Sequence, residues 1–154
     1  MQTRKARLAD LDQVTDLAVA LQKYHEPFDN SFALRRDAKR GIKSFLKRNL
    51  YSKKSLLIVA EENRRIVGYL LATLASRPPI FKHRQYGFVM DAYVSEEFRG
   101  RGAAKGMLSQ AYSWFKKHKV REAVLTVHTE NRLGIRVWDK EGFETVFLRK
   151  RKRI

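Results

Sequence analysis

The sequence contains no cysteine, only three prolines, and 16 acidic residues against 33 lysines and arginines. The lack of cysteine excludes disulfides, thiolate metal sites and a cysteine nucleophile, and it is typical of intracellular proteins. No window approaches the roughly 18 apolar residues of a membrane span. The opening MQTRKARLAD also contains no apolar run of signal-peptide length. We therefore expect a cytoplasmic protein with no membrane partner.

The shortage of acidic residues leaves a net charge of +17. A surface this basic attracts polyanions such as nucleic acid, anionic lipid or a phosphorylated cofactor. The lysines and arginines are spread along the whole chain, and the only dense run is Arg149–Arg153, in a basic C-terminal tail at about 149–154. We interpret the excess as solvated surface plus an anionic cofactor site, while a dedicated nucleic-acid surface stays open as the alternative.

Hydrophobic periodicity divides the 154 residues into elements of a single domain, 1–154, without repeats or linkers. Helices are expected at about 10–24, 34–50, 102–119 and 131–141, and strands at 3–8, 55–61, 66–75, 86–94, 122–128 and 143–148. This order, β-α-α-β-β-β-α-β-α-β, predicts an α/β fold with one mixed central sheet and helices on both faces. A ligand of such a sheet belongs at the carboxyl ends of its central strands.

The stretch from Tyr86 to Met107 meets that expectation, because it joins a strand to a helix through the loop RGRGAAK. Gly100 and Gly102, followed by two small alanines, would expose a row of backbone N–H groups at the start of the helix. Such a row binds phosphate through unpaired donors and the positive end of the helix dipole. The sequence therefore predicts an anion site at this junction.

Two motifs connect the junction to a known family. The first, Arg/Gln-x-x-Gly-x-Gly/Ala, is present as Arg99–Ala104, and the second as Leu125, Val127, Asn131, Gly142 and Phe143. In this order and context they resemble the GNAT superfamily of N-acetyltransferases over nearly the whole chain. The resemblance implies a mostly antiparallel sheet, acetyl-CoA as donor with no metal, and a primary amine of a small molecule or peptide as acceptor. It also implies direct attack in a ternary complex, with no covalent intermediate.

The resemblance places the pyrophosphate of acetyl-CoA on the loop and its pantetheine arm beside the preceding strand, which splays from its neighbour. Asn131 would bond the arm, although it also suits an ordinary helix N-cap, and the two roles are compatible. Trp138 stands where many relatives carry a tyrosine acid. Since an indole N–H cannot deliver a proton at neutral pH, we interpret Trp138 as a wall against the arm or the core. The expected cofactor-binding residues are Ala92, Tyr93, Val94, Arg99, Gly100, Arg101, Gly102, Ala103, Ala104, Lys105, Asn131 and Trp138.

The sequence identifies less clearly the residue that would accept a proton from the amine. Asp91 is the only carboxylate in the strand expected at 86–94, so it is the first candidate, with pairing to an arginine as the alternative. His128, on the neighbouring expected strand, is the second catalytic candidate, and simple packing is its alternative. Tyr24 and His25 lie where the first helix and its following loop generally shape the acceptor pocket in this fold. They are the expected substrate-binding residues.

A second function stays open beside the enzyme. The net charge, the basic tail and the missing tyrosine also suit a nucleic-acid- or ribosome-associated binding module that retains a CoA-binding fold with little or no catalysis. For the enzyme, the basic balance argues against a polycationic acceptor unless the pocket is locally acidic. A homodimer formed through the last strand or through residues 80–86 is also left open.

Overall fold

The computed structural model describes all of residues 1–154, in which five strands form one sheet in the order β1-β2-β3-β4-β5. The first four strands pair antiparallel, and the last runs parallel to its neighbour. The expected mixed, mostly antiparallel sheet is therefore confirmed. The strands are β1 (Gln2–Lys5), β2 (Ser55–Glu62), β3 (Arg65–Ser76), β4 (Gln85–Val94) and β5 (Ala123–Leu125).

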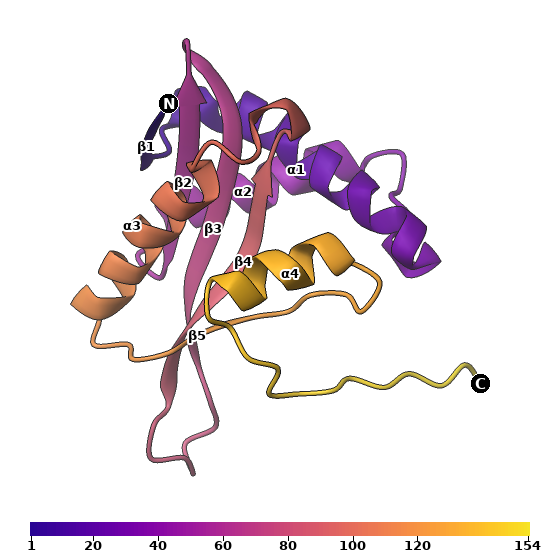
Figure 1. Ribbon diagram of the computed structural model, residues 1–154, viewed down its shortest axis with the longest axis vertical. Helices are drawn as coiled ribbons and strands as arrows, with labels where there is room; N and C mark the ends of the chain where they lie inside the picture. Colours follow the sequence, from indigo (N-terminus) through magenta and orange to yellow (C-terminus); the bar gives the residue numbers. More distant parts are fainter.

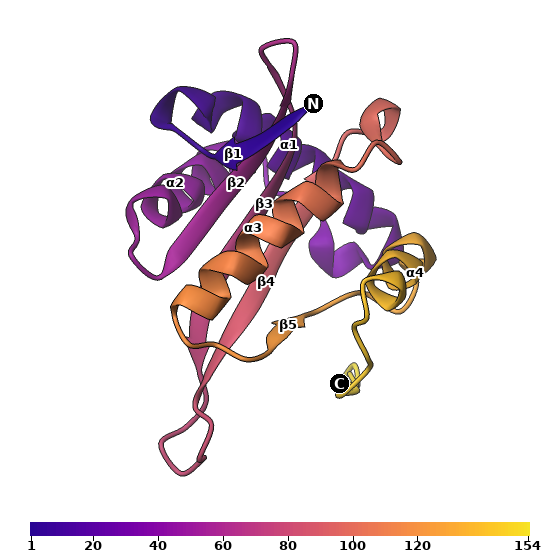
Figure 2. The same cartoon turned by 60° about the vertical axis from the view of Figure 1, so that its left-hand side comes forward.

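Helices cover both faces of this sheet (Figures 1 and 2). α1 (Leu11–His25) and α2 (Ala38–Tyr51) lie on one face, and α3 (Ala103–Lys117), which links β4 to β5, lies on the other. α4 (Arg132–Lys140) follows β5 and lies beside the C-terminal end of α1, as both views show. None of the helices is long and apolar enough to span a bilayer.

The alternation of side chains in the central strands builds a separate core on each face. In β2, Ile58 packs toward α3, whereas its neighbours Leu57 and Val59 pack toward α1 and α2. Tyr69 of β3 is fully buried on the α1–α2 face, and its hydroxyl reaches the candidate site described below. The α3 side of the sheet is closed by residues at helical spacing: Ala103, Met107, Leu108, Ala111 and Phe115.

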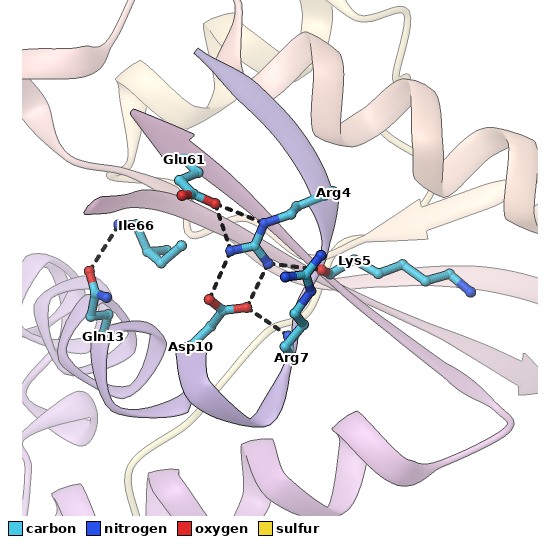
Figure 3. Close-up of polar contacts among 7 residues, drawn as sticks. All are labelled: Arg4, Lys5, Arg7, Asp10, Gln13, Glu61 and Ile66. Atoms are coloured by element: carbon cyan, nitrogen blue, oxygen red, sulfur yellow. Dashed lines mark hydrogen bonds and ion pairs between the residues drawn. The ribbon is translucent and has the colours of Figure 1, made fainter. Parts of the chain in front are cut away.

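A partly buried cluster of charges fixes the edge strand β1 to the rest of the sheet (Figure 3). The Arg4 guanidinium donates two hydrogen bonds to the Asp10 carboxylate, at 2.7 and 2.9 Å, and a third to Glu61 of β2 at 2.8 Å. The Arg7 amide also donates to Asp10 at 2.6 Å. These bonds, Arg4 above all, hold the pKa of Asp10 below its ordinary value of 3.8.

The expected final strand at 143–148 is wrong. Residues 141–154 contain no strand, and Phe147 is 86% exposed. Two features explain the difference. Gly142, with a φ of 85°, ends α4, and the Phe143 amide bonds the Trp138 carbonyl at 3.0 Å, which holds the start of this segment at the helix end. β5 is also only three residues long, so it offers little edge for a further strand.

Other boundaries shift by a few residues. β1 ends at Lys5 because residues 8–10 form a 3₁₀ turn. α2 begins at Ala38 rather than near 34, because two 3₁₀ turns at 26–28 and 30–32 occupy the connection from α1. The expected strand at 122–128 shortens to β5, and α3 lies within its expected range.

Candidate functional site

The loop between β4 and α3 presents a row of unpaired backbone donors. The amides of Phe98 and Arg99 bond the carbonyls of Ser95 and Glu96, and the next paired amide is that of Gly106, which bonds the Gly102 carbonyl at 2.9 Å. The six amides of residues 100–105 have no acceptor in the protein. Because the first turn of α3 also contributes the positive end of its dipole, this loop can bind an anion.

Two glycines give the loop its shape. Gly100 has a φ of 74° and Gly102, at the N-cap of α3, a φ of 85°, both in the left-handed region that other residues adopt at a cost. A Cβ at either position would meet nothing within 4 Å. The space over the loop is therefore open for a phosphate group, and the exposed cations Arg101 and Lys105 lie on either side of Gly102 in the sequence.

The strand that leads into this loop has an unpaired edge. β4 pairs with β5 only at Gly87, Phe88 and Val89, where β5 ends, whereas its pairing with β3 continues to Val94. The edge of β4 from Met90 to Val94 is consequently free of a strand partner. The splay between β4 and its neighbour, expected from the family resemblance, is thus present.

Arg99 lies at the end of this free edge. Its Nε donates to the Val94 carbonyl at 3.0 Å, and its guanidinium lies 5.8 Å from the Tyr93 ring centre and 5.9 Å from that of Tyr24. The side chain therefore connects β4 to the C-terminal end of α1. It also occupies one of the carbonyl acceptors that a bound ligand could use.

Asp91 is half-buried on β4, next to a bulge. The register with β3 shifts between the Leu71–Asp91 and Ala72–Val89 pairs, so Met90 is the extra residue. The Tyr69 hydroxyl donates to the Asp91 carboxylate at 3.2 Å, and no arginine pairs with Asp91. Burial raises the pKa of Asp91 above its ordinary value, and the Tyr69 hydrogen bond offsets part of this rise. A carboxylate of this kind is suited to accepting a proton.

Asn131 caps α4 and joins it to α1. Its Oδ1 accepts from the Gly134 amide at 2.9 Å and from the Tyr24 hydroxyl at 3.1 Å. The N-cap role is therefore present, and the amide nitrogen of Asn131 is left as a donor for a ligand. Trp138, on the same helix, packs against the α3-side core and lies edge-to-face with Phe143 at 5.6 Å.

The two candidate catalytic residues do not contact each other by hydrogen bond or ion pair. His128 lies 3.8 Å from a carboxylate oxygen of Asp29 instead, in a cluster of rings that includes His25 and Phe28. Burial, followed by the charge of His128, lowers the pKa of His25, so His25 is neutral at pH 7. Of the two expected substrate-binding residues, Tyr24 lies next to Arg99 and His25 belongs to this cluster.

This combination of an anion loop, a free strand edge and a raised carboxylate pKa can be compared with known proteins. The sequence model of the acetyltransferase (GNAT) family matches residues 17–143. The chain belongs to the GNAT acetyltransferase family. The match includes both the loop and the block from Leu125 to Phe143. The motif-based prediction of an acetyltransferase is thereby confirmed.

Individual relatives agree with this assignment. An uncharacterized N-acetyltransferase, YhfO of Bacillus subtilis, is 25% identical over 94% of this chain and 90% of its own. The tetramutant of the BH1408 protein from Bacillus halodurans superposes with a TM-score of 0.90 at 21% identity, covering 100% of both chains. A predicted acetyltransferase from Clostridium acetobutylicum, whose structure contains acetyl-CoA, superposes with a TM-score of 0.75 at 23% identity over 97% of this chain and 95% of its own. These superpositions show that the two solved structures share the fold of this GNAT chain.

The sequence patterns did not predict two residues of the site, Tyr69 and Asp29. Tyr69 carried no signal, because a tyrosine in a hydrophobic strand reads as core. Asp29 lies in the turn-forming run PFDN, which indicated only a break between helices. Its contacts with His128 and Arg151 join segments far apart in the chain, and no local pattern predicts such pairings.

Proposed function

We propose that this GNAT protein moves an acetyl group from acetyl-CoA to a primary amine of a small molecule or peptide, by direct attack in a ternary complex. The observation that carries the proposal is the row of six partnerless amides at 100–105, at the end of the strand that bears Asp91. Pyrophosphate binding requires such donors. Few other ligands would use both these donors and a free strand edge next to them.

The residues present fit acetyl-CoA, which would supply the thioester carbonyl that the amine attacks. The amides of 100–105 would hold the pyrophosphate, with Arg101 and Lys105 as nearby cations. The free edge from Met90 to Val94 would pair with the amides of the pantetheine arm as an added strand does. Asn131 would donate from its amide nitrogen, and Arg99 would release the Val94 carbonyl.

Asp91 is the proposed general base. An amine that is mostly protonated at pH 7 must lose a proton before it can attack, and burial makes Asp91 a stronger base than an ordinary carboxylate. Tyr69 would orient the carboxylate through its hydrogen bond. A backbone N–H near Val94 would stabilise the oxyanion. His128 stays the second proposed base, acting through water, and Trp138 would line the arm without protonating the thiolate.

The proposal is tested by measuring release of the CoA thiol over a panel of primary amines. The wild-type protein should release thiol only when an acceptor amine is present. Asp91→Asn should lose turnover while its affinity for acetyl-CoA is retained, and Asp16→Asn, an exposed ion-pair residue of α1, should behave as the wild type. Unchanged turnover in Asp91→Asn would remove this residue from the chemistry. Acetyl-CoA binding without transfer to any amine would reject the proposed reaction.

The alternative function, a nucleic-acid- or ribosome-associated module, is distinguished by thermal unfolding. An enzyme should show a rise in Tm with CoA and none with RNA. Tight, steeply salt-dependent RNA binding that survives saturation with CoA would favour the module instead.

A further inference from the structure

Asp29 is an ion-paired carboxylate on a basic protein. It lies between the two 3₁₀ turns that follow α1, and its side chain is only 8% exposed. Its Oδ1 accepts from the Ser31 amide at 2.9 Å, and its Oδ2 lies 2.6 Å from a guanidinium nitrogen of Arg151 and 3.8 Å from His128. The Ser31 hydrogen bonds, together with Arg151, lower the pKa of Asp29 to about 2, so the group is ionised at physiological pH.

Aromatic rings gather around His128, the imidazole that lies next to this carboxylate. Phe28 stacks on His128 with ring centres 5.9 Å apart, and Phe32 meets the same imidazole edge-on at 6.0 Å. His25 adds a third contact, 5.8 Å from Phe32. A carboxylate next to a cluster of aromatic rings is a combination that binds an ammonium or guanidinium group, through a charge-assisted hydrogen bond and cation–π attraction.

The cluster is continuous with the proposed reaction centre. The Tyr24 ring lies 5.2 Å from that of Phe28, and its hydroxyl bonds Asn131. On its other side Tyr24 contacts the Arg99 guanidinium, which also lies over Tyr93 of β4. A chain of direct contacts therefore leads from the end of β4 to Asp29, along the end of α1 where the acceptor is expected.

The ion pair of Arg151 with Asp29 could be replaced by that of a ligand cation. Arg151 belongs to the C-terminal tail, which has no secondary structure and no buried residue. The Asp29 pair is the only ion pair or hydrogen bond made by residues 144–154. The Arg151 side chain is itself 57% exposed. A ligand cation could take its place without disrupting any other part of the fold.

We propose that Asp29 and the aromatic cluster at His128 form a subsite for a second cationic group of the acceptor, and that Arg151 occupies this subsite in the free enzyme as an internal competitor. The inference rests on the proposed acetyltransferase function and narrows its substrate class to amines that carry a further ammonium or guanidinium group. The net charge of +17 opposes such acceptors at long range. Asp29 and Asp91 supply negative charge locally, which is the condition that the sequence set for such an acceptor.

The test compares straight-chain diamines of increasing length with monoamines of the same length. The wild type should acetylate one length of diamine with a KM about tenfold or more below that of its monoamine, the factor of one charge-assisted contact. Asp29→Asn should abolish this diamine-to-monoamine ratio. Arg151→Gln should increase it by lowering the KM for the diamine, whereas Arg153→Gln, a matched change two residues further along the tail, should leave it at the wild-type value.

Equal use of diamines and monoamines by the wild type and Asp29→Asn would overturn the subsite while leaving acetyl transfer intact. If no amine is acetylated, the reaction itself fails, and calorimetric titration of the CoA-loaded protein with the diamines decides the subsite. Binding weakened by Asp29→Asn and strengthened by Arg151→Gln supports it, and equal binding by all three proteins contradicts it. Arg151→Gln alters an exposed tail, so its result does not depend on the folding of the Asp29 variant.

Discussion

At the scale of single residues, Asp91 occupies the position of the proposed general base, and its burial disfavours the ionised carboxylate. If it is the general base, Asp91→Asn should lower kcat by about 100-fold or more, the usual contribution of a positioned base. Because burial raises the pKa of Asp91, the acidic limb of the wild-type pH–rate profile should lie above the ordinary carboxyl range. Steady-state kinetics over a pH series measures both. A limb at the ordinary value of 3.8 would contradict this role.

The same substitution should stabilise the fold. A raised pKa means that folded Asp91 binds its proton more tightly than the unfolded chain does, so its contribution to stability falls as pH rises from 3.8 through the folded value. At neutral pH the ionised group therefore destabilises the protein, and Asp91→Asn removes that effect. Thermal unfolding at pH 7 should give a higher Tm for the variant. A variant that is inactive and also less stable would indicate a structural role for Asp91.

Asp10 should behave in the opposite way. Its pKa is lowered, so it stabilises the fold fully above 3.8, and this contribution is lost as pH falls through the folded pKa. Asp10→Asn should lower the unfolding free energy at pH 7 by about 2 kcal/mol, since Arg4 loses one of its two charged partners in a partly buried setting. Asp12→Asn is the control, because its pair with Lys43 is exposed and should contribute little. Denaturant unfolding at pH 7 would contradict the account if both variants lost the same stability.

At the scale of elements, the strand–loop–helix junction depends on a backbone conformation. Gly102→Val would force a β-branched residue into a φ of 85°, at a cost of roughly 1–2 kcal/mol, and should weaken CoA binding by about tenfold or more by displacing the N-terminal amides of α3. Gly41→Ala is the control. It lies within α2 with nothing near its Cβ, so it should stabilise the protein slightly and leave CoA binding unchanged. Calorimetry measures both affinities, and an unaltered affinity in Gly102→Val would remove the loop from the site.

The sequence predicts this junction well because its signals are local. Glycines at 100 and 102, the apolar run before them and the helical spacing after them lie within one short stretch. The final strand failed for a non-local reason. Its β-branched and aromatic residues at 143–148 suit a strand, but pairing requires an adjacent edge, and β5 ends at Leu125. Pattern alone cannot state how long a neighbouring strand will be.

The residues of the candidate site also divide into those that local sequence signals predict and those that depend on non-local contacts. The loop amides follow from the motif, whereas the bulge at Met90 and the Tyr69–Asp91 hydrogen bond depend on the register between β3 and β4. The Asp29–Arg151 pair joins the connection after α1 to the tail. Contacts of this kind are set by the assembled fold, and a single sequence contains no pattern that specifies them.

At the scale of the whole molecule, part of the surplus positive charge can be removed without disturbing the fold. The basic tail carries several of the surplus cations, but only Arg151 forms an ion pair with the body of the protein. Replacing Arg149, Lys150, Lys152 and Arg153 by glutamine, with Arg151 retained, should reduce non-specific RNA retention and leave the KM for acetyl-CoA unchanged. Filter binding and steady-state kinetics on the same preparation measure the two effects. A large loss of acetyl-CoA affinity would show that the tail takes part in cofactor binding.

The central claim is that the loop after β4 binds the pyrophosphate of CoA and the free edge of β4 binds its pantetheine arm. The most direct test follows backbone amide resonances by NMR during titration with CoA and, separately, with pantetheine, which lacks the pyrophosphate. The account predicts that CoA shifts the amides of residues 100–105 together with those of 90–94, and that pantetheine shifts only the latter. CoA binding that leaves the amides of 100–105 unmoved would contradict it.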